Sequence, residues 1–107
     1  MASNVSQITF EEARADAEKQ AYADIDSFRK DKSIPLLDDE YLEAEHCWMF
    51  FQNKDIYLAP EYQFSHRAYA YSKKKGVGRT VYDLRDDPER MSEHLQYMSD
   101  FFAKRGE

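Results

Sequence analysis

Tyr41–Leu58, YLEAEHCWMFFQNKDIYL, is the stretch around which we expect the rest of the chain to assemble. Its first part alternates, with Glu43 and Glu45 between apolar residues, as in a strand that has one solvated face. Its middle, Cys47–Phe51, is apolar without interruption, as in a strand covered on both faces. We therefore predict a central strand at 42–52 that is solvated where it begins and covered at its aromatic end.

Further extended segments are expected after this strand. Residues 53–55 are polar and predict a turn, after which Ile56–Ala59 should return beside the central strand as a hairpin. Residues 61–66 lack periodicity and are predicted to form a loop. Arg67–Lys73 alternates strictly, which predicts a strand, and the glycines of the next turn lead to a closing strand at 79–83.

The alternating strand has two faces of different size. Tyr69 and Tyr71 share one face, whereas Ala68, Ala70 and Ser72 share the other. We expect the small face to lie beneath the alanine-striped helix at 10–30, because the alanines let that helix lie close to whatever it covers. The tyrosines would then point to the opposite side of the sheet.

A helix is predicted at each end of the chain. Phe10–Lys30 has apolar residues at helical spacing, an alanine stripe in its middle and a capping box, Thr9–Glu12, at its start. The second helix begins at Asp87 with an N-cap followed by proline, and Gly106 follows its end. Its apolar stripe consists of Met91, Leu95, Met98 and Phe102.

Length and composition predict a single α+β domain, residues 1–107. Of the 107 residues, 42% are hydrophobic and 15% aromatic, which suffices for one core. The expected fold is an N-terminal helix packed on an antiparallel sheet of about four strands, followed by a C-terminal helix. The first eight residues are expected to be a disordered or loosely docked leader. One cysteine, no long apolar run and no signal-peptide pattern favour the cytoplasm.

The net charge of −6 is distributed unevenly along the chain. Residues 1–45 contain 12 acidic and 5 basic side chains, whereas residues 46–107 contain 9 and 10. An acidic surface disfavours nucleic acid as a direct partner, because phosphate binding depends on basic side chains. It is compatible with a basic protein partner or with solubility alone.

Five carboxylates fall within eight residues around the start of the predicted central strand. They form either a solvated loop or an acidic docking surface. In an extended chain, Glu43 and Glu45 point to the same face, which allows the carboxylates to converge on one cationic partner. The five residues are Asp38, Asp39, Glu40, Glu43 and Glu45, and a second acidic group, Asp83, Asp86, Asp87 and Glu89, is an alternative surface.

The residues that commonly carry catalysis or hold metals show no supporting spacing. Cys47 follows His46, but neighbours along a strand point to opposite faces, so His46 is not placed to activate the thiol. Cys47, His46, His66 and His94 also lack the spacing of a zinc site. We therefore expect no enzymatic activity, no cofactor and no metal.

The order of these features is similar to that of a known group of proteins. An N-terminal helix precedes an aromatic strand around Trp48–Phe51, an alternating strand at Ala68–Lys73 and a helix that contains Tyr97–Phe102. This order resembles the small α+β immunity proteins of bacterial toxin–immunity pairs, including those of contact-dependent growth inhibition and other polymorphic toxins. The resemblance implies a cytoplasmic protein that binds and neutralises a cognate toxin domain, expected to be a basic nuclease. It assigns no individual residue.

The expected partner is therefore a basic toxin domain, with no direct nucleic-acid or membrane contact and with the chain a monomer or weak homodimer. Acidic side chains would speed association, and aromatic anchors would supply affinity. A tyrosine can act as such an anchor only if its side chain is exposed. The candidate partner-binding residues are Asp38, Asp39, Glu40, Glu43, Glu45, Tyr62, Tyr69 and Tyr71.

Two other classes of function remain open. A small ligand-binding or enzymatic α+β domain would have a pocket between the sheet and its covering helix, lined by Tyr69, Tyr71 and Trp48. A homodimeric adaptor would instead join two copies through an exposed sheet face. A pocket with convergent polar groups favours the first class, and self-association in solution favours the second.

Overall fold

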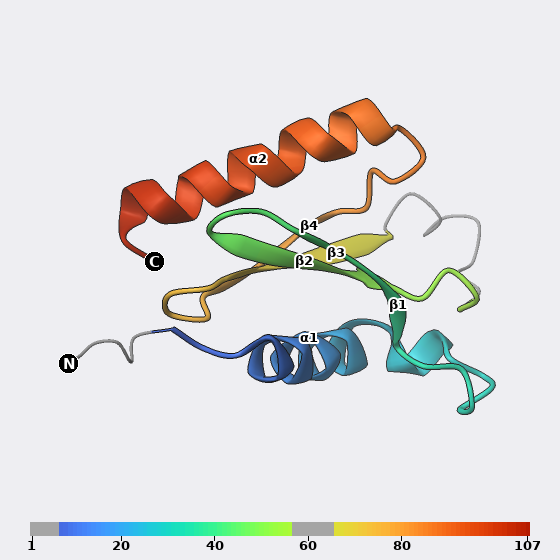
Figure 1. Cartoon of the computed structure of the whole chain (residues 1–107). Coiled ribbons are helices and arrows are strands. Elements are labelled where there is room, and N and C mark those ends of the chain that lie inside the picture. Colours follow the sequence, from blue (N-terminus) through green and yellow to red (C-terminus); the bar gives the residue numbers. More distant parts are fainter. Residues whose placement is uncertain (1–6, 57–65) are drawn as a thin grey trace.

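A computed structural model of the chain describes residues 7–56 and 66–107. The strands form one antiparallel sheet in the order β1-β2-β3-β4, with α1 on one face and α2 on the other (Figure 1). The predicted α+β fold is confirmed. Neither helix in the described part of the chain has the length and apolar character needed to cross a bilayer. The elements are α1 (Phe10–Ile25), η2 (Asp26–Phe28), β1 (Leu37–Glu43), β2 (Cys47–Gln52), β3 (Arg67–Ser72), β4 (Gly78–Tyr82) and α2 (Pro88–Arg105).

The stretch predicted as one strand at 42–52 forms parts of two strands, β1 and β2, and the turn between them. The Ala44 N–H donates to the Cys47 carbonyl oxygen at 2.9 Å and closes this turn. The prediction of a continuous strand was wrong, because the alternating half and the apolar half belong to two different strands of the sheet. The alternating half belongs to the edge strand β1, whereas β2 lies between β1 and β3 and is buried throughout.

β1 also takes the place beside β2 that was predicted for Ile56–Ala59. The two neighbours of β2 are β1 and β3, so the hairpin prediction was wrong for this strand. Ile56 is buried in the core on the α1 side but belongs to no strand. Residues 57–59, and all of the predicted loop at 61–66 except its last residue, lie outside the described residues.

The large and small faces of β3 point opposite to the prediction. Tyr69 and Tyr71 lie in the core beneath α1, whose buried stripe is formed by alanines, and Ala68 and Ala70 face α2. Close packing requires large side chains to lie opposite small ones. The alanines of α1 leave room for the tyrosine rings, whereas α2 contributes Met and Phe side chains that need small residues opposite them.

α1 begins with the predicted capping box but ends earlier than predicted. Thr9 and Glu12 exchange both capping hydrogen bonds, at 2.9 and 3.0 Å. The helix stops at Ile25 rather than Lys30. The Asp26 carboxylate there binds Arg29 and Lys32, at 2.7 and 2.9 Å, and the chain enters the 3₁₀ turn η2. Arg29 and Lys32 therefore lie beyond the end of α1, where they pair with Asp26.

The end of the predicted leader is attached to the domain. The Ile8 N–H donates to the Lys73 carbonyl oxygen at 3.0 Å, and the Ile8 side chain packs on the turn between β3 and β4. Gly76 in this turn has φ +68°, and a Cβ there would lie 2.9 Å from Ile8 Cδ1. Both constraints favour glycine. Residues 1–6 lie outside the described residues.

α2 follows its sequence signals closely. Asp87 caps it by accepting from the Arg90 N–H at 3.3 Å, and Gly106 ends it in the left-handed conformation with φ +70°. Met91, Met98 and Phe102 of the predicted stripe are buried, and Leu95 packs against them. The N-cap, the apolar stripe and the terminal glycine are confirmed.

Unfolding should depend on pH through His94 of α2. Its Nε2 is buried without a hydrogen-bond partner in the described part of the chain, and burial lowers its pKa below the ordinary value of 6.5. As the pH falls through this value, the unfolded chain takes up a proton that the folded chain does not. The free energy of unfolding should therefore fall until the lowered pKa of the folded state is reached.

Chemical denaturation at several pH values checks this expectation. His94→Phe keeps a flat ring against Tyr97 but removes the titration, so it should flatten the decline in stability on acidification. His46 is more exposed to solvent, and His46→Gln serves as the matched control that keeps the decline. An equal slope in wild type and His94→Phe would contradict the assignment.

Candidate functional site

The five carboxylates predicted to dock a partner lie on one edge of the sheet. Four of them belong to the edge strand β1, and the fifth, Glu45, lies in the turn to β2. Most are exposed, whereas Asp38 is half-buried. We call this surface the acidic edge: Asp38, Asp39, Glu40, Glu43 and Glu45.

A bulge in β1 determines how these carboxylates point. Leu37 pairs with Gln52 and Tyr41 pairs with Phe50, so β1 uses more residues than β2 over the same length. Extra residues disturb the strict alternation of side chains and increase the local twist. Asp38–Glu40 lie in this irregular part, and Asp38 and Glu40 both reach the same cation.

That cation is Arg85, at the centre of the acidic edge. Its guanidinium lies 2.8 Å from Asp38 Oδ2, 2.8 Å from Glu40 Oε1 and 2.7 Å from Asp83 Oδ2. The side chain is only 7% exposed, and the guanidinium carbon lies 4.1 Å from the centre of the Phe51 ring. Three carboxylates around one guanidinium leave a net negative charge held in a fixed geometry.

The charged state of Arg85 is stable in this setting. Burial by itself disfavours the charge, but hydrogen bonds to Asp83, Asp38 and Glu40 raise its pKa above the ordinary value. Sequence reasoning missed this residue. The signal in the sequence was its position: Arg85 is the one basic residue in the acidic stretch 83–87.

The remaining carboxylates of the acidic edge are less constrained. Glu43 pairs with Lys73, whose ammonium also lies 5.3 Å from the centre of the Trp48 ring. The Glu45 carboxylate lies 3.7 Å from His46 Nε2, and its side chain is 84% exposed. Asp39 is exposed and has no ion pair within residues 7–56 and 66–107. Asp39 and Glu45 are therefore available to a partner.

Tyr41 supplies an exposed aromatic side chain in the middle of the acidic edge. It is 43% exposed, and its ring is held by Phe10 and Phe50, with centres 4.6 and 6.3 Å away. The tyrosines predicted for this role are placed differently. Tyr69 and Tyr71 are buried, which corrects the expectation that they contact a partner, and Tyr62 lies outside the described residues.

A small apolar hollow adjoins the acidic edge on the α2 side of the sheet. It has a volume of about 280 Å³. Glu40 and Arg85 form its polar rim, so an apolar side chain entering it would pass beside the carboxylates. Its apolar lining comes from Leu42, Pro88, Met91 and Leu95.

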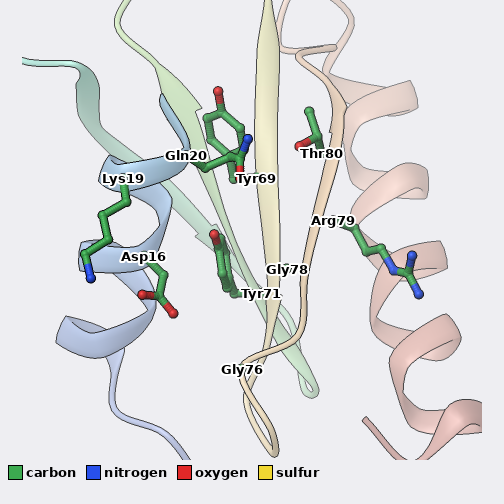
Figure 2. Close-up of a pocket in the computed structure, with 9 residues that line it drawn as sticks. All are labelled: Asp16, Lys19, Gln20, Tyr69, Tyr71, Gly76, Gly78, Arg79 and Thr80. Atoms are coloured by element: carbon green, nitrogen blue, oxygen red, sulfur yellow. The ribbon is translucent and has the colours of Figure 1, made fainter. Parts of the chain in front are cut away.

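A second hollow, of about 410 Å³, lies between α1 and the β3–β4 half of the sheet. Figure 2 shows Tyr69 and Tyr71 in it, whereas the Arg79 side chain points away toward α2. The Tyr69 hydroxyl donates to Asp24 and accepts from Gln52, each at 2.8 Å. Two of the three tyrosine and tryptophan residues predicted to line a ligand pocket are therefore found here, and Trp48 is not among the lining residues.

Comparison with known proteins gives no match to this chain, whether with protein-family models, with curated proteins or with solved structures. The arrangement of the residues and their chemistry are therefore what bear on function. The acidic edge combines fixed negative charge, one exposed aromatic ring and an apolar hollow. Protein-binding surfaces combine the same elements.

The lone thiol is placed as a packing residue. Cys47 is fully buried, and burial raises its pKa to about 11, so the thiolate is disfavoured at neutral pH. His46 lies in the turn before it and donates its backbone N–H to Ser99 at 3.0 Å. In the described part of the chain, no three His, Cys, Asp or Glu side chains gather as metal ligands.

Proposed function

We propose that the protein is a cytoplasmic immunity protein that binds and neutralises a cognate bacterial toxin domain, a basic nuclease, through its acidic edge. The order of its sequence features supports this proposal by resemblance. The observation that carries it is the cluster around Arg85, where Asp38 and Glu40 of the edge strand β1 share one guanidinium with Asp83, which follows β4. Such a cluster presents negative charge that is fixed before a partner arrives.

The physical role of each part follows from its position. Exposed carboxylates attract a basic substrate-binding cleft over several ångströms and raise the association rate. Tyr41 is rigid and half-exposed, so it can enter a partner surface at a low entropic cost. The hollow beside Glu40 and Leu42 can receive an apolar side chain in return. Covering the cleft would block access of nucleic acid to the toxin.

Co-purification tests the proposal directly. The chain should be retained by the toxin domain encoded beside its gene, and its expression should protect cells that produce this domain. A complex that forms without loss of toxin activity would contradict neutralisation. Failure to bind the domain at all would contradict the proposed function as a whole.

Neutralising the free carboxylates should slow this association. In Asp39→Asn with Glu45→Gln, the association rate with the toxin domain is expected to fall about tenfold at low salt, with a weaker salt dependence. Asp38 and Glu40 are left unchanged because they hold Arg85. Stopped-flow or surface-based kinetics at several salt concentrations measure the effect.

The matched control removes the same number of charges elsewhere. Glu18→Gln with Glu93→Gln changes exposed residues on the outer faces of α1 and α2 and should leave the rate nearly unchanged. Equal slowing by the two double variants would indicate an effect of total charge. An unchanged rate in the first variant would exclude the acidic edge as the docking surface.

A further inference from the structure

The two edges of the sheet differ in how well they are protected against pairing with another strand. β1 is bulged and acidic, and both features discourage the addition of a strand. β4 instead pairs with β3 residue for residue, from Tyr71–Gly78 to Arg67–Tyr82, without a bulge. Its one charged residue, Arg79, is turned onto the Phe101 ring of α2, at 5.4 Å. β4 is therefore a regular edge with little charge along it.

The outward backbone groups of β4 are available for pairing. The Ser72 N–H donates to Val77, and the Asp83 N–H donates to His66, at 3.0 and 3.1 Å. Hydrogen-bonded and non-hydrogen-bonded pairs alternate along an antiparallel ladder. The N–H and C=O groups of Gly78, Thr80 and Tyr82 therefore point away from β3, and they have no hydrogen-bond partner in the described ranges 7–56 and 66–107.

Exposed aromatic rings flank this edge on both faces. Tyr82 is 67% exposed on the α1 face, and Tyr97 of α2 is 62% exposed on the other face. The Tyr97 ring stacks on Phe101, which in turn contacts Arg79 of β4. Aromatic residues are enriched in protein interfaces, and Tyr in particular combines an apolar ring with a polar tip.

We propose that β4 pairs with β4 of a second copy of the chain, antiparallel and centred on Thr80, so that two sheets become one. In this register Thr80 lies opposite Thr80 of the other copy, and Gly78 lies opposite Tyr82. Every outward group of Gly78, Thr80 and Tyr82 then finds a partner. Arg79 lies opposite Val81, so no like charges face each other directly.

The side chains on the α1 face fit the same register. The Tyr71 ring lies over Gly78, where a Cβ would be 2.7 Å from Tyr71 Cε1. Tyr82 of the other copy, placed opposite Gly78, would meet this ring and enter the hollow between α1 and β4 (Figure 2). The contact is the same in both directions, as a two-fold dimer requires.

A second copy fits this edge better than the basic partner proposed for β1. The two hollows along β4 each contain both charge signs, Asp16 with Lys19 in one and Asp24 with Arg67 in the other, so neither offers the excess negative charge that would attract a cationic strand. The acidic edge is at the opposite side of the sheet and stays free in the dimer. Self-association therefore does not depend on the proposed toxin binding, and each can fail separately.

Charge swapping at Thr80 tests the register. Thr80→Glu and Thr80→Lys each place two like charges opposite one another only in this self-pairing, so each variant should be monomeric where the wild type dimerises. Mixing the two variants places opposite charges there and should restore the dimer. Sedimentation equilibrium of the full chain across a wide concentration range measures the outcome.

Ala15→Glu, which adds the same charge on an exposed part of α1, is the matched control and should dimerise like the wild type. Circular dichroism confirms that each variant is folded. A wild type that is monomeric at all concentrations would overturn the proposal. Dimers that persist in both single variants, or that the mixture does not restore, would also overturn pairing at Thr80.

Discussion

Replacing Arg85 by alanine is expected to lower the free energy of unfolding by about 3 kcal/mol or more, because it leaves buried carboxylates without their cation. The Asp83 side chain is buried and that of Asp38 is half-buried, so water cannot fully replace the guanidinium there. The lost contact with the Phe51 ring adds to the cost. Chemical denaturation of the variant and the wild type measures the change.

Two further variants separate the causes of this loss. Arg90→Ala removes an exposed arginine near the start of α2 and should change stability by less than about 0.5 kcal/mol. Arg85→Lys keeps the positive charge but lacks the planar fork of donors that spans the three carboxylates, so its stability should lie between those of the wild type and Arg85→Ala. A loss no larger than that of Arg90→Ala would mean that the cluster does not hold β1 to the rest of the sheet.

Replacing Phe50 by alanine should cost about 3 to 5 kcal/mol of stability. Phe50 is fully buried in the centre of β2 beneath α1. Its ring centre lies 5.4 Å from that of Phe10 and 6.3 Å from those of Tyr41 and Tyr71. The alanine stripe of α1 has no side chain long enough to fill the resulting cavity, so little of the loss should be recovered by relaxation.

Tyr22→Ala is the control for this prediction, because Tyr22 is an aromatic residue of similar size that is 60% exposed on α1. Its removal should change the free energy of unfolding by less than about 1 kcal/mol. Similar losses for the two variants would contradict the packing of α1 on β2. Phe50→Ala should also loosen Tyr41, because the two rings are in contact.

The two sheet edges give the molecule two surfaces of different character. β1 carries fixed negative charge and Tyr41, which suit a basic partner that arrives by electrostatic attraction. β4 carries exposed backbone groups and Tyr82, which suit a strand of its own sequence. Because β2 and β3 separate these edges, a dimer through β4 would present two acidic edges at its outer sides.

Local signals in the sequence predicted the helices and the strand at Arg67 well. The capping box at Thr9, the N-cap at Asp87 and the glycine at 106 all act within one helical turn, so their residues identify the element directly. The apolar run at Cys47–Phe51 likewise predicted a strand covered on both faces, because side chains on both sides of a strand must then leave water.

Tertiary structure alone decided which surfaces these elements present. The pairing of Arg85 with Asp38 and Glu40 could not be predicted from the sequence, because an ion pair between residues so far apart in the chain depends on how the strands are ordered. The same holds for Tyr69 and Tyr71, whose alternation predicts a shared face but not the helix that covers it. Periodicity is a property of one segment, whereas partner choice depends on complementary volumes and charges brought together by folding.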